Sequence, residues 1–346
     1  MNHLSEHQVL IFLVQFALLL GLSRWLGLVF QRFNQPTITA EILVGVILGP
    51  TLLGRLVPGL YAWLFPEDPV SMIMIETVAW IGILFLLLET GLEVNFSRIW
   101  RQKGQAVKIA VSDIILPILI SGAFIYWLPD HYLPDPGQRW MFTGFIATIM
   151  TISALPIAIR VMHDVNILKT DMGFLVISAL TINDIIGWVI FALLLGSVSL
   201  HTTSIPVLIG LVAATVGYTF VTLKYVRKLL DRMIRQIKEL YTENMAVAIS
   251  LISVLGMISG AITLKIGIHA LFGFFILGMA AGESSALSEK DRITISRMVY
   301  AIFVPVFFAG IGLKIDFIEN FEVLPALLIT LVGITARYGG AYIGSI

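Results

Sequence analysis

The sequence predicts an all-α polytopic membrane protein built from two inverted repeats, and three observations support this. The 346-residue chain is 58% hydrophobic and only 13% charged, whereas soluble domains carry about a quarter charged residues. Its apolar residues gather into about eleven runs, most of them close to the roughly 20 residues that cross a bilayer as a helix. Short motifs also recur, in the same order, in the two halves of the chain.

The apolar runs alternate with polar loops, and each run is expected to form one membrane span. Most of the 22 lysines and arginines fall in every second loop, beginning with the loop after the first span. Because cytoplasmic loops are enriched in these residues, we expect the N-terminus outside. The spans are expected near 8–30, 37–54, 72–94, 106–128, 141–160, 172–198, 206–227, 244–264, 268–282, 298–314 and 324–345.

Composition also excludes several classes of partner and site. The chain has 22 acidic and 22 basic residues and therefore no net charge, so we expect no nucleic-acid partner. It contains no cysteine, which excludes disulfides and thiolate metal sites. The expected surroundings are the lipid bilayer, and no cofactor is expected.

The stretch from Lys224 to Glu243 differs from the spans. Apolar residues recur there at helical spacing with lysine and arginine between them. This pattern predicts an amphipathic helix on the cytoplasmic interface. It can serve as a linker between two halves that move or as a basic anchor, and the two roles are compatible.

Two short motifs indicate the internal repeat. The sequence GLEVNF at 91–96, at the end of the third span, is echoed by GLKIDF at 312–317 at the end of the tenth. Leu48-Gly49 in the second span is echoed by Leu277-Gly278 in the ninth. The two copies run in opposite directions, as in secondary transporters, whose site lies at the repeat interface near the midplane. Counterparts of the fifth and sixth spans would fall beyond Ile346, so we expect a C-terminally truncated chain.

The pair Asn183-Asp184 lies in the middle of the apolar run 172–198. An ionised side chain at that depth costs about 2.5–3.5 kcal/mol on insertion scales and is tolerated mainly where it faces protein or a water-filled cavity. Asp184 is therefore the first functional candidate.

The fifth span contains Thr151, Ser153 and Pro156. Pro156 cannot donate a helical hydrogen bond and disturbs the carbonyl four residues back. The hydroxyl groups can then face a bound cation in a discontinuous helix, or can bond back to the helix in an ordinary proline kink. The neighbouring pair Asn183-Asp184 favours the first interpretation.

Arg337 lies inside the last span and cannot lose its charge, so it needs a polar partner. Asn183, Glu89 and Glu93 are candidates. Asp113 belongs by position to the same group of helices as Asp184, and can act as a ligand to a neighbouring helix.

Taken together, these segments resemble the monovalent cation:proton antiporter superfamily, in the branch with bacterial sodium/proton and potassium/proton antiporters and plant cation/proton exchangers. The matching motifs run in family order across nearly the whole chain. They are Gly45–Pro50, Gly91–Glu93, Thr151-x-Ser153-x-x-Pro156, Asn183-Asp184-x-x-Gly187-Trp188, and Pro305–Phe308 with Gly312-Leu313.

The resemblance implies a sodium/proton antiporter-like fold, with about eleven of the family's thirteen helices present. It implies a homodimer in a bacterial inner membrane, with a dimerising panel domain and a core domain with crossed, broken helices. The expected divisions are panel helices at 1–104, core helices at 105–200, a linker and cytoplasmic stretch at 201–243, panel helices at 244–320, and the truncated second core repeat at 321–346.

The resemblance also implies roles for the candidate residues. Asp184 would bind cation and proton in turn, and Asn183 would match the first position of the family's acidic pair, where asparagine accompanies electroneutral exchange. Arg337 would match the basic residue that precedes the second broken helix. From their chemistry, Thr181, Thr151 and Ser153 can add the oxygen ligands that a hard monovalent cation requires.

We therefore expect a transporter and not an enzyme: an electroneutral, elevator-type antiporter that exchanges Na⁺ or K⁺ for H⁺ and serves pH homeostasis. An ion-coupled symporter on a similar inverted-repeat fold and a non-transporting truncated homologue are the alternatives. An intramembrane aspartyl protease is disfavoured, because that chemistry needs two facing aspartates and Asp184 has no second motif.

Overall fold

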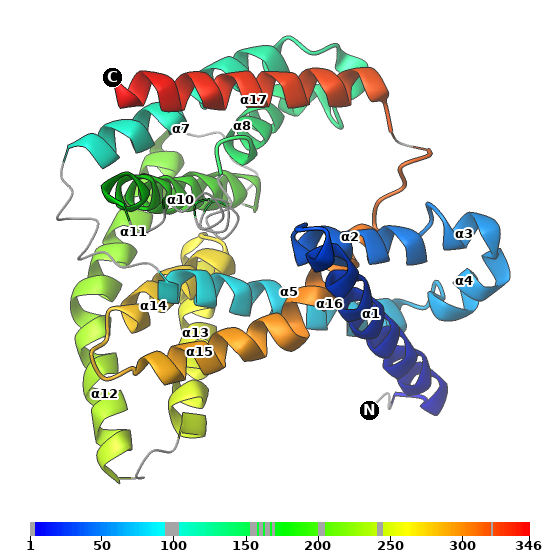
Figure 1. Cartoon of the computed structure of the whole chain (residues 1–346), viewed down its shortest axis with the longest axis horizontal. Helices are drawn as coiled ribbons and strands as arrows, with labels where there is room; N and C mark the ends of the chain where they lie inside the picture. The colour runs from blue at the N-terminus through cyan, green and yellow to red at the C-terminus, as the bar shows by residue number, and fades with distance from the viewer. Residues whose placement is uncertain are drawn as a thin grey trace. The chain divides into compact units, whose positions relative to one another are not determined.

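The computed structural model describes residues 4–93, 104–152, 170–199, 205–240, 245–319 and 321–346, together with Ala158, Met162 and Ile167. Every regular element within these residues is a helix (Figure 1). Nine helices in this part of the chain are long and apolar enough to cross a membrane. The predicted all-α polytopic architecture is confirmed.

The chain forms two compact units. Unit 1 combines residues 1–89 with 288–322, and unit 2 combines 90–287 with 323–346. Unit 1 contains α1 (Glu6–Arg32), α2 (Thr37–Leu48), α3 (Leu53–Leu56), α4 (Pro58–Leu64), most of α5 (Pro69–Glu93), α15 (Glu289–Met298), η4 (Val299–Phe303) and α16 (Val304–Leu313). Unit 2 contains α7 (Gln105–Tyr126), η1 (Asp130–Tyr132), η2 (Pro136–Gln138), α8 (Arg139–Ile149), α10 (Asp171–Ser199), α11 (Ile205–Val221), η3 (Thr222–Val226), α12 (Arg227–Leu240), α13 (Met245–Ile266), α14 (Ala270–Gly282) and α17 (Val323–Ser345).

This division differs from the expected one at the second panel segment, 244–320. In the structure α13 and α14 belong to unit 2, whereas α15, η4 and α16 belong to unit 1. The reason is the packing of α14, which is buried from Leu271 to Gly282 and packs against α13, α12 and α10 within unit 2. A helix that is apolar all round is expected to be enclosed by other helices.

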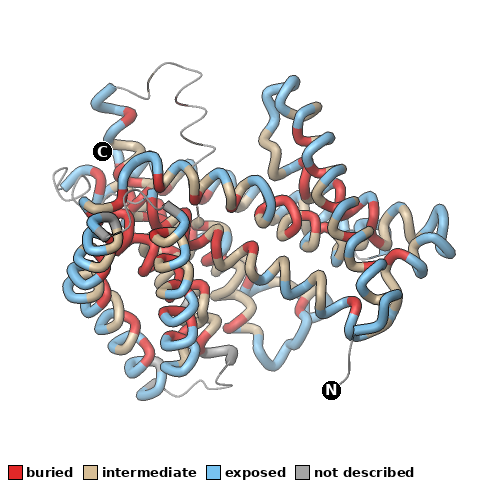
Figure 2. Tube along the Cα trace, turned by 90° about the horizontal axis from the view of Figure 1, so that it is seen from below, coloured by how far each residue is buried: buried red, intermediate tan, exposed pale blue. Residues whose placement is uncertain are grey.

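Most other helices bury one face only, as Figure 2 shows by the alternation of buried and exposed positions along them. In α1, for example, Ile11 and Leu19 are buried, whereas Leu13 and Leu28 are exposed. Exposed leucines at such density are normal where a helix faces lipid, because the apolar solvent makes their exposure favourable.

The crossing of α2 and α16 in unit 1 depends on glycine. A Cβ atom on Gly312 would lie 2.1 Å from the carbonyl oxygen of Ile42 and 2.9 Å from the Cα atom of Gly45. A Cβ on Gly45 would in turn lie 2.0 Å from the carbonyl oxygen of Ala309. The two backbones therefore touch, and any larger residue at either glycine would force the helices apart.

The same contact recurs in unit 2, between α14 and the last turn of α5, which belongs to unit 2 from Thr90 on. A Cβ on Gly91 would lie 2.3 Å from the carbonyl oxygen of Phe275 and 2.9 Å from the Cα of Gly278. The same number of residues separates Gly278 from Gly45 and Phe275 from Ile42. The two contacts therefore involve equivalent positions of the repeat. The repeat predicted from Gly91 and Gly312 thus reappears as an equivalent helix crossing in each unit.

The register of the repeat needs one correction. The Leu-Gly dipeptides predicted that Gly49 of the first repeat is equivalent to Gly278 of the second. The helix contacts instead make Gly45 equivalent to Gly278, and Gly49 equivalent to Gly282. A Cβ on Gly282 would lie 2.5 Å from the carbonyl oxygen of Leu92, and one on Gly49 would lie 3.2 Å from that of Leu313. Both helices carry two glycines one turn apart, and the dipeptide match selected the wrong turn.

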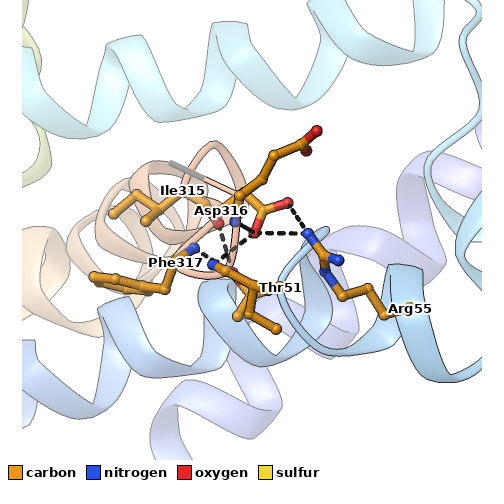
Figure 3. Close-up of polar contacts among 7 residues, drawn as sticks. Thr51, Arg55, Ile315, Asp316 and Phe317 are labelled. Carbon is orange, nitrogen blue, oxygen red and sulfur yellow. Dashed lines mark hydrogen bonds and ion pairs between the residues drawn. The ribbon is translucent and has the colours of Figure 1, made fainter. Parts of the chain in front are cut away.

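A polar cluster fixes the end of α16 in unit 1 (Figure 3). The Thr51 hydroxyl donates to the carbonyl oxygen of Ile315 at 2.9 Å and accepts from the backbone N–H of Phe317 at 3.2 Å. Asp316 forms an ion pair with Arg55 at 3.0 Å. Its carboxylate also accepts hydrogen bonds from the backbone N–H groups of Ile318 and Glu319. The cluster thus anchors the chain leaving α16 onto α3 and the turn that precedes it.

The described part of the stretch predicted as an amphipathic helix, residues 224–240, continues α11 without a break. The helix runs from α11 through a π-helical turn, η3, into α12, and Figure 1 shows it as one long element. Its apolar positions Leu230 and Ile234 are fully buried, so this face packs within unit 2.

Candidate ion-binding site

The candidate site forms in unit 2, where α17 packs closely along α7 (Figure 1). Glycines on α17 allow this approach, since a Cβ on Gly340 would lie 2.9 Å from the carbonyl oxygen of Ser112 and one on Gly344 would lie 2.6 Å from the Cα of Ile109. The close packing places Arg337, one turn before Gly340, beside the polar residues of α7.

Arg337 and Asp113 form the central ion pair. The Nη2 atom of Arg337 lies 2.8 Å from Oδ2 of Asp113. The same carboxylate oxygen accepts a hydrogen bond from Nδ2 of Asn183 at 2.8 Å. One acid on α7 thus connects the arginine of α17 to the asparagine of α10, and charge-assisted bonds of this kind are among the strongest in proteins.

Arg337 also binds backbone carbonyl oxygens just after the end of α8. Its Nη1 atom donates to the carbonyl oxygen of Thr151 and lies 3.5 Å from that of Met150. The helix α8 ends at Ile149, well inside the fifth predicted span. The last carbonyls of a helix lack intrahelical partners and carry partial negative charge, which the guanidinium offsets.

The amide of Asn183 has a fixed orientation. Its Nδ2 must face Asp113, because only the nitrogen can donate to a carboxylate. Its Oδ1 is buried and has no hydrogen-bond partner among the described residues. A buried carbonyl oxygen left in this state is costly, and a bound cation would satisfy it.

The neighbouring groups are buried oxygens. Asp184 is 5% exposed and Asn183 is fully buried. Thr151 and Thr181 are buried as well, and each hydroxyl donates to a carbonyl of its own chain three or four residues back at 2.7 Å. A hydroxyl whose hydrogen is used in this way keeps its lone pairs, so both threonines present acceptor oxygens only.

The remaining predicted residues are distributed as follows. Glu89 lies in unit 1 and accepts a hydrogen bond from Ser296 at 2.9 Å. Glu93 ends α5 at an exposed position. Ser153 and Pro156 lie outside the described residues.

Asp113 is thus an ion-pair partner of Arg337, whereas the partners expected from the sequence were Asn183, Glu89 and Glu93. The signal for Asp113 was present: it is an acid inside the apolar run 106–128, in the same kind of position as Asp184. What the sequence did not show is that α7 and α17 pack side by side.

Comparison with known proteins places these observations in context. Residues 16–346 match the family model described as sodium/hydrogen exchanger, transmembrane. Cation/H(+) antiporter 19 of Arabidopsis thaliana is 30% identical over 88% of this chain and 37% of its own length. Na(+)/H(+) antiporter NhaS4 of Synechocystis is 28% identical over 98% of this chain and 83% of its own.

A yeast relative and a solved structure complete the comparison. K(+)/H(+) antiporter 1 of Saccharomyces cerevisiae is 27% identical over 90% of this chain and 36% of its own length. This chain therefore spans little more than a third of the plant and yeast relatives. The structure of the sodium proton antiporter MjNhaP1 from Methanocaldococcus jannaschii superposes with a TM-score of 0.70, at 22% identity, over 97% of this chain and 79% of that one.

Proposed function

Since this chain belongs to the sodium/hydrogen exchanger family, we propose that it exchanges a monovalent cation, Na⁺ or K⁺, for H⁺ across the membrane that its apolar helices span. The observation that supports this most strongly is the buried Asn183-Asp184 pair in α10, with acceptor oxygens around it. The relatives named above are cation/proton antiporters by name, which agrees with that chemistry.

Asp184 is the group that binds proton and cation in turn. A protonated carboxyl group no longer has the negative charge that coordinates a cation. The proton and the cation therefore compete for one site. Asn183 Oδ1, Thr151 and Thr181 supply further oxygens, and hard cations bind through such ligands. Ser153, two residues after Thr151 in the chain, is a further candidate ligand because of its hydroxyl group.

Electroneutral exchange follows from the charges in this cluster. The Asp113 carboxylate and the Arg337 guanidinium form an ion pair and cancel each other. One proton and one monovalent cation each add a single positive charge at Asp184. The two loaded states therefore carry the same charge, and a membrane potential favours neither.

The remaining parts of the proposal have separate support. An elevator-type movement agrees with the division of the chain into two compact units. The outside N-terminus rests on the distribution of lysine and arginine. The homodimer and the bacterial inner membrane rest on the family resemblance.

The proposal is tested by proton flux in proteoliposomes that contain the 346-residue chain and a pH-sensitive dye. A gradient of Na⁺ or K⁺ should drive proton movement, with Li⁺ as a third driving ion, and Asp184→Asn should abolish it. The matched control is Asp171→Asn, which removes an exposed acid at the start of the same helix. Wild-type flux in Asp184→Asn, or no flux with any cation in the wild type, would overturn the proposal.

A further inference from the structure

The long helix α11–η3–α12 extends beyond the thickness of a bilayer. From Ile205 to Leu240 it is about 54 Å long at 1.5 Å per residue, whereas the hydrocarbon core measures about 30 Å. No charged residue occurs from Ile205 to Leu223, a stretch of about 28 Å. The hydrocarbon region therefore ends near Leu223, and the helix enters the headgroup layer, about 5–8 Å thick on each side, with the basic residues that follow.

The side chain of Lys224 marks this boundary. Its Nζ atom lies 4.8 Å from the ring centroid of Phe220 and 5.5 Å from that of Tyr225. Aromatic rings beside lysine are typical of the interface between hydrocarbon and headgroups. Tyr225 is 57% exposed, so this boundary faces outward from unit 2.

One set of charges on α12 is used inside unit 2. Arg227 pairs with Glu283 at 3.0 Å, and Asp231 accepts from the Ser284 hydroxyl at 2.7 Å. Arg235 donates to Ser285 at 2.8 Å. These contacts bind α12 to the loop after α14, and they occupy the helix face beside the buried Leu230 and Ile234.

A second set faces outward. Lys224, Lys228 and Arg232 follow one another at intervals of four residues, which places them on one face of a helix. All three are exposed, and none forms an ion pair within the described part of the chain. The apolar Leu229 beside them is 54% exposed.

We propose that Lys224, Lys228 and Arg232 form a binding surface for the headgroups of anionic phospholipids, which we name the basic stripe. Lys224 and Lys228 lie within the headgroup layer, and the long side chain of Arg232, one turn further out, can extend back towards it. Three such cations beside an exposed leucine and aromatic rings match a ligand that combines a phosphate with acyl chains. The basic stripe is separate from the Asp184 cluster and does not depend on the proposed exchange activity.

The test measures thermal unfolding of the purified chain in an uncharged detergent while lipid is added. Phosphatidylglycerol should raise the melting temperature of the wild type, and phosphatidylcholine should leave it unchanged. Lys228→Gln combined with Arg232→Gln should raise the phosphatidylglycerol concentration for half-maximal effect about thirtyfold, as expected for the loss of two surface cations. Because both residues are exposed, the melting temperature without lipid should stay at the wild-type value.

The matched control is Lys290→Gln combined with Arg297→Gln, which removes two exposed basic residues of α15 and should leave the lipid response unchanged. An equal loss in the control and in the stripe variant would overturn the proposal, because the effect would then be general attraction to positive charge. So would equal stabilisation of the wild type by glycerol phosphate, which would indicate a simple anion site. The readout is thermal, so its failure is distinguishable from failure of transport.

Discussion

Replacing Arg337 by methionine tests whether the ion pair with Asp113 organises the site. The change keeps a flexible side chain of similar length but removes the guanidinium that bridges Asp113 and the end of α8. Breaking a fully buried ion pair by removing one partner costs about 3–5 kcal/mol. The Arg337 side chain is 28% exposed and that of Asp113 is 9% exposed, so water partly screens the loss. We expect a destabilisation of about 2–3 kcal/mol.

The assay is thermal unfolding of the detergent-solubilised protein, with Arg337→Met, Asp113→Asn and the double variant measured together. At roughly 2 °C per kcal/mol for a chain of this size, Arg337→Met should melt about 5 °C lower. The double variant should lose less than the sum of the single variants, by about 2 kcal/mol, because each single change leaves a partner without its ion pair. Arg297→Met, at an exposed position, is the control and should change little.

Two results would refute this reasoning. One is a melting temperature of Arg337→Met within about 1 °C of the wild type, and the other is strict additivity in the double variant. Arg337 cannot deprotonate and so cannot carry the exchanged proton. Exchange that remains in Arg337→Met should therefore still be coupled to protons.

Three further predictions concern the helix crossings, the anchor of α16 and the charge of the cluster. Gly312→Ala and Gly91→Ala should each lower the melting temperature or prevent folding, because the new Cβ would meet backbone atoms. The control is Gly21→Ala, whose Cβ would meet nothing within 4 Å. Equal behaviour of all three variants would contradict the close helix crossings. The backbone N–H groups of Ile318 and Glu319, with Arg55, hold the pKa of Asp316 below its ordinary value. Asp316→Asn should therefore lower the melting temperature at neutral pH. The difference should begin to shrink as the pH falls below about 4, where the unfolded chain is protonated, and vanish below the lowered pKa of the folded Asp316. A difference that persists in stronger acid would contradict this. Asn183→Asp adds a second carboxylate that can carry a further proton. Any exchange that remains should then move more protons than cations per cycle and respond to an imposed membrane potential, whereas flux that ignores the potential would argue against this.

The sequence predicted the helices well because hydrophobicity determines where a chain crosses a membrane. The eleventh span, expected at 324–345, appears as α17 at Val323–Ser345, and the ninth, expected at 268–282, appears as α14 at Ala270–Gly282. The tenth span was placed too short, since the capping box of Ser288 and Asp291 starts a continuous helix before the apolar run. Local signals of this kind were available but were weaker than the apolar pattern.

The arrangement of the helices could be predicted only in part. Gly91 and Gly312 were recognised as equivalent, but a repeated dipeptide cannot show which glycine faces the neighbouring helix, and the register was therefore one turn off. The partner of Arg337 could not be derived either, because Asp113 is far away in the sequence and meets it only through the packing of α7 against α17. Asn183 and Asp184 were found because an amide and an acid inside an apolar run are costly and need a reason.

The central claim is that proton and cation compete for Asp184, and proton release on cation binding tests it most directly. Na⁺ or K⁺ is added to the detergent-solubilised protein in a weakly buffered solution, and the pH change is followed with an indicator dye at several starting pH values. We expect the wild type and Asp171→Asn to release about one proton for each cation bound, and Asp184→Asn to release none. Cation binding without proton release, or the same release from Asp184→Asn, would show that proton and cation do not compete for Asp184.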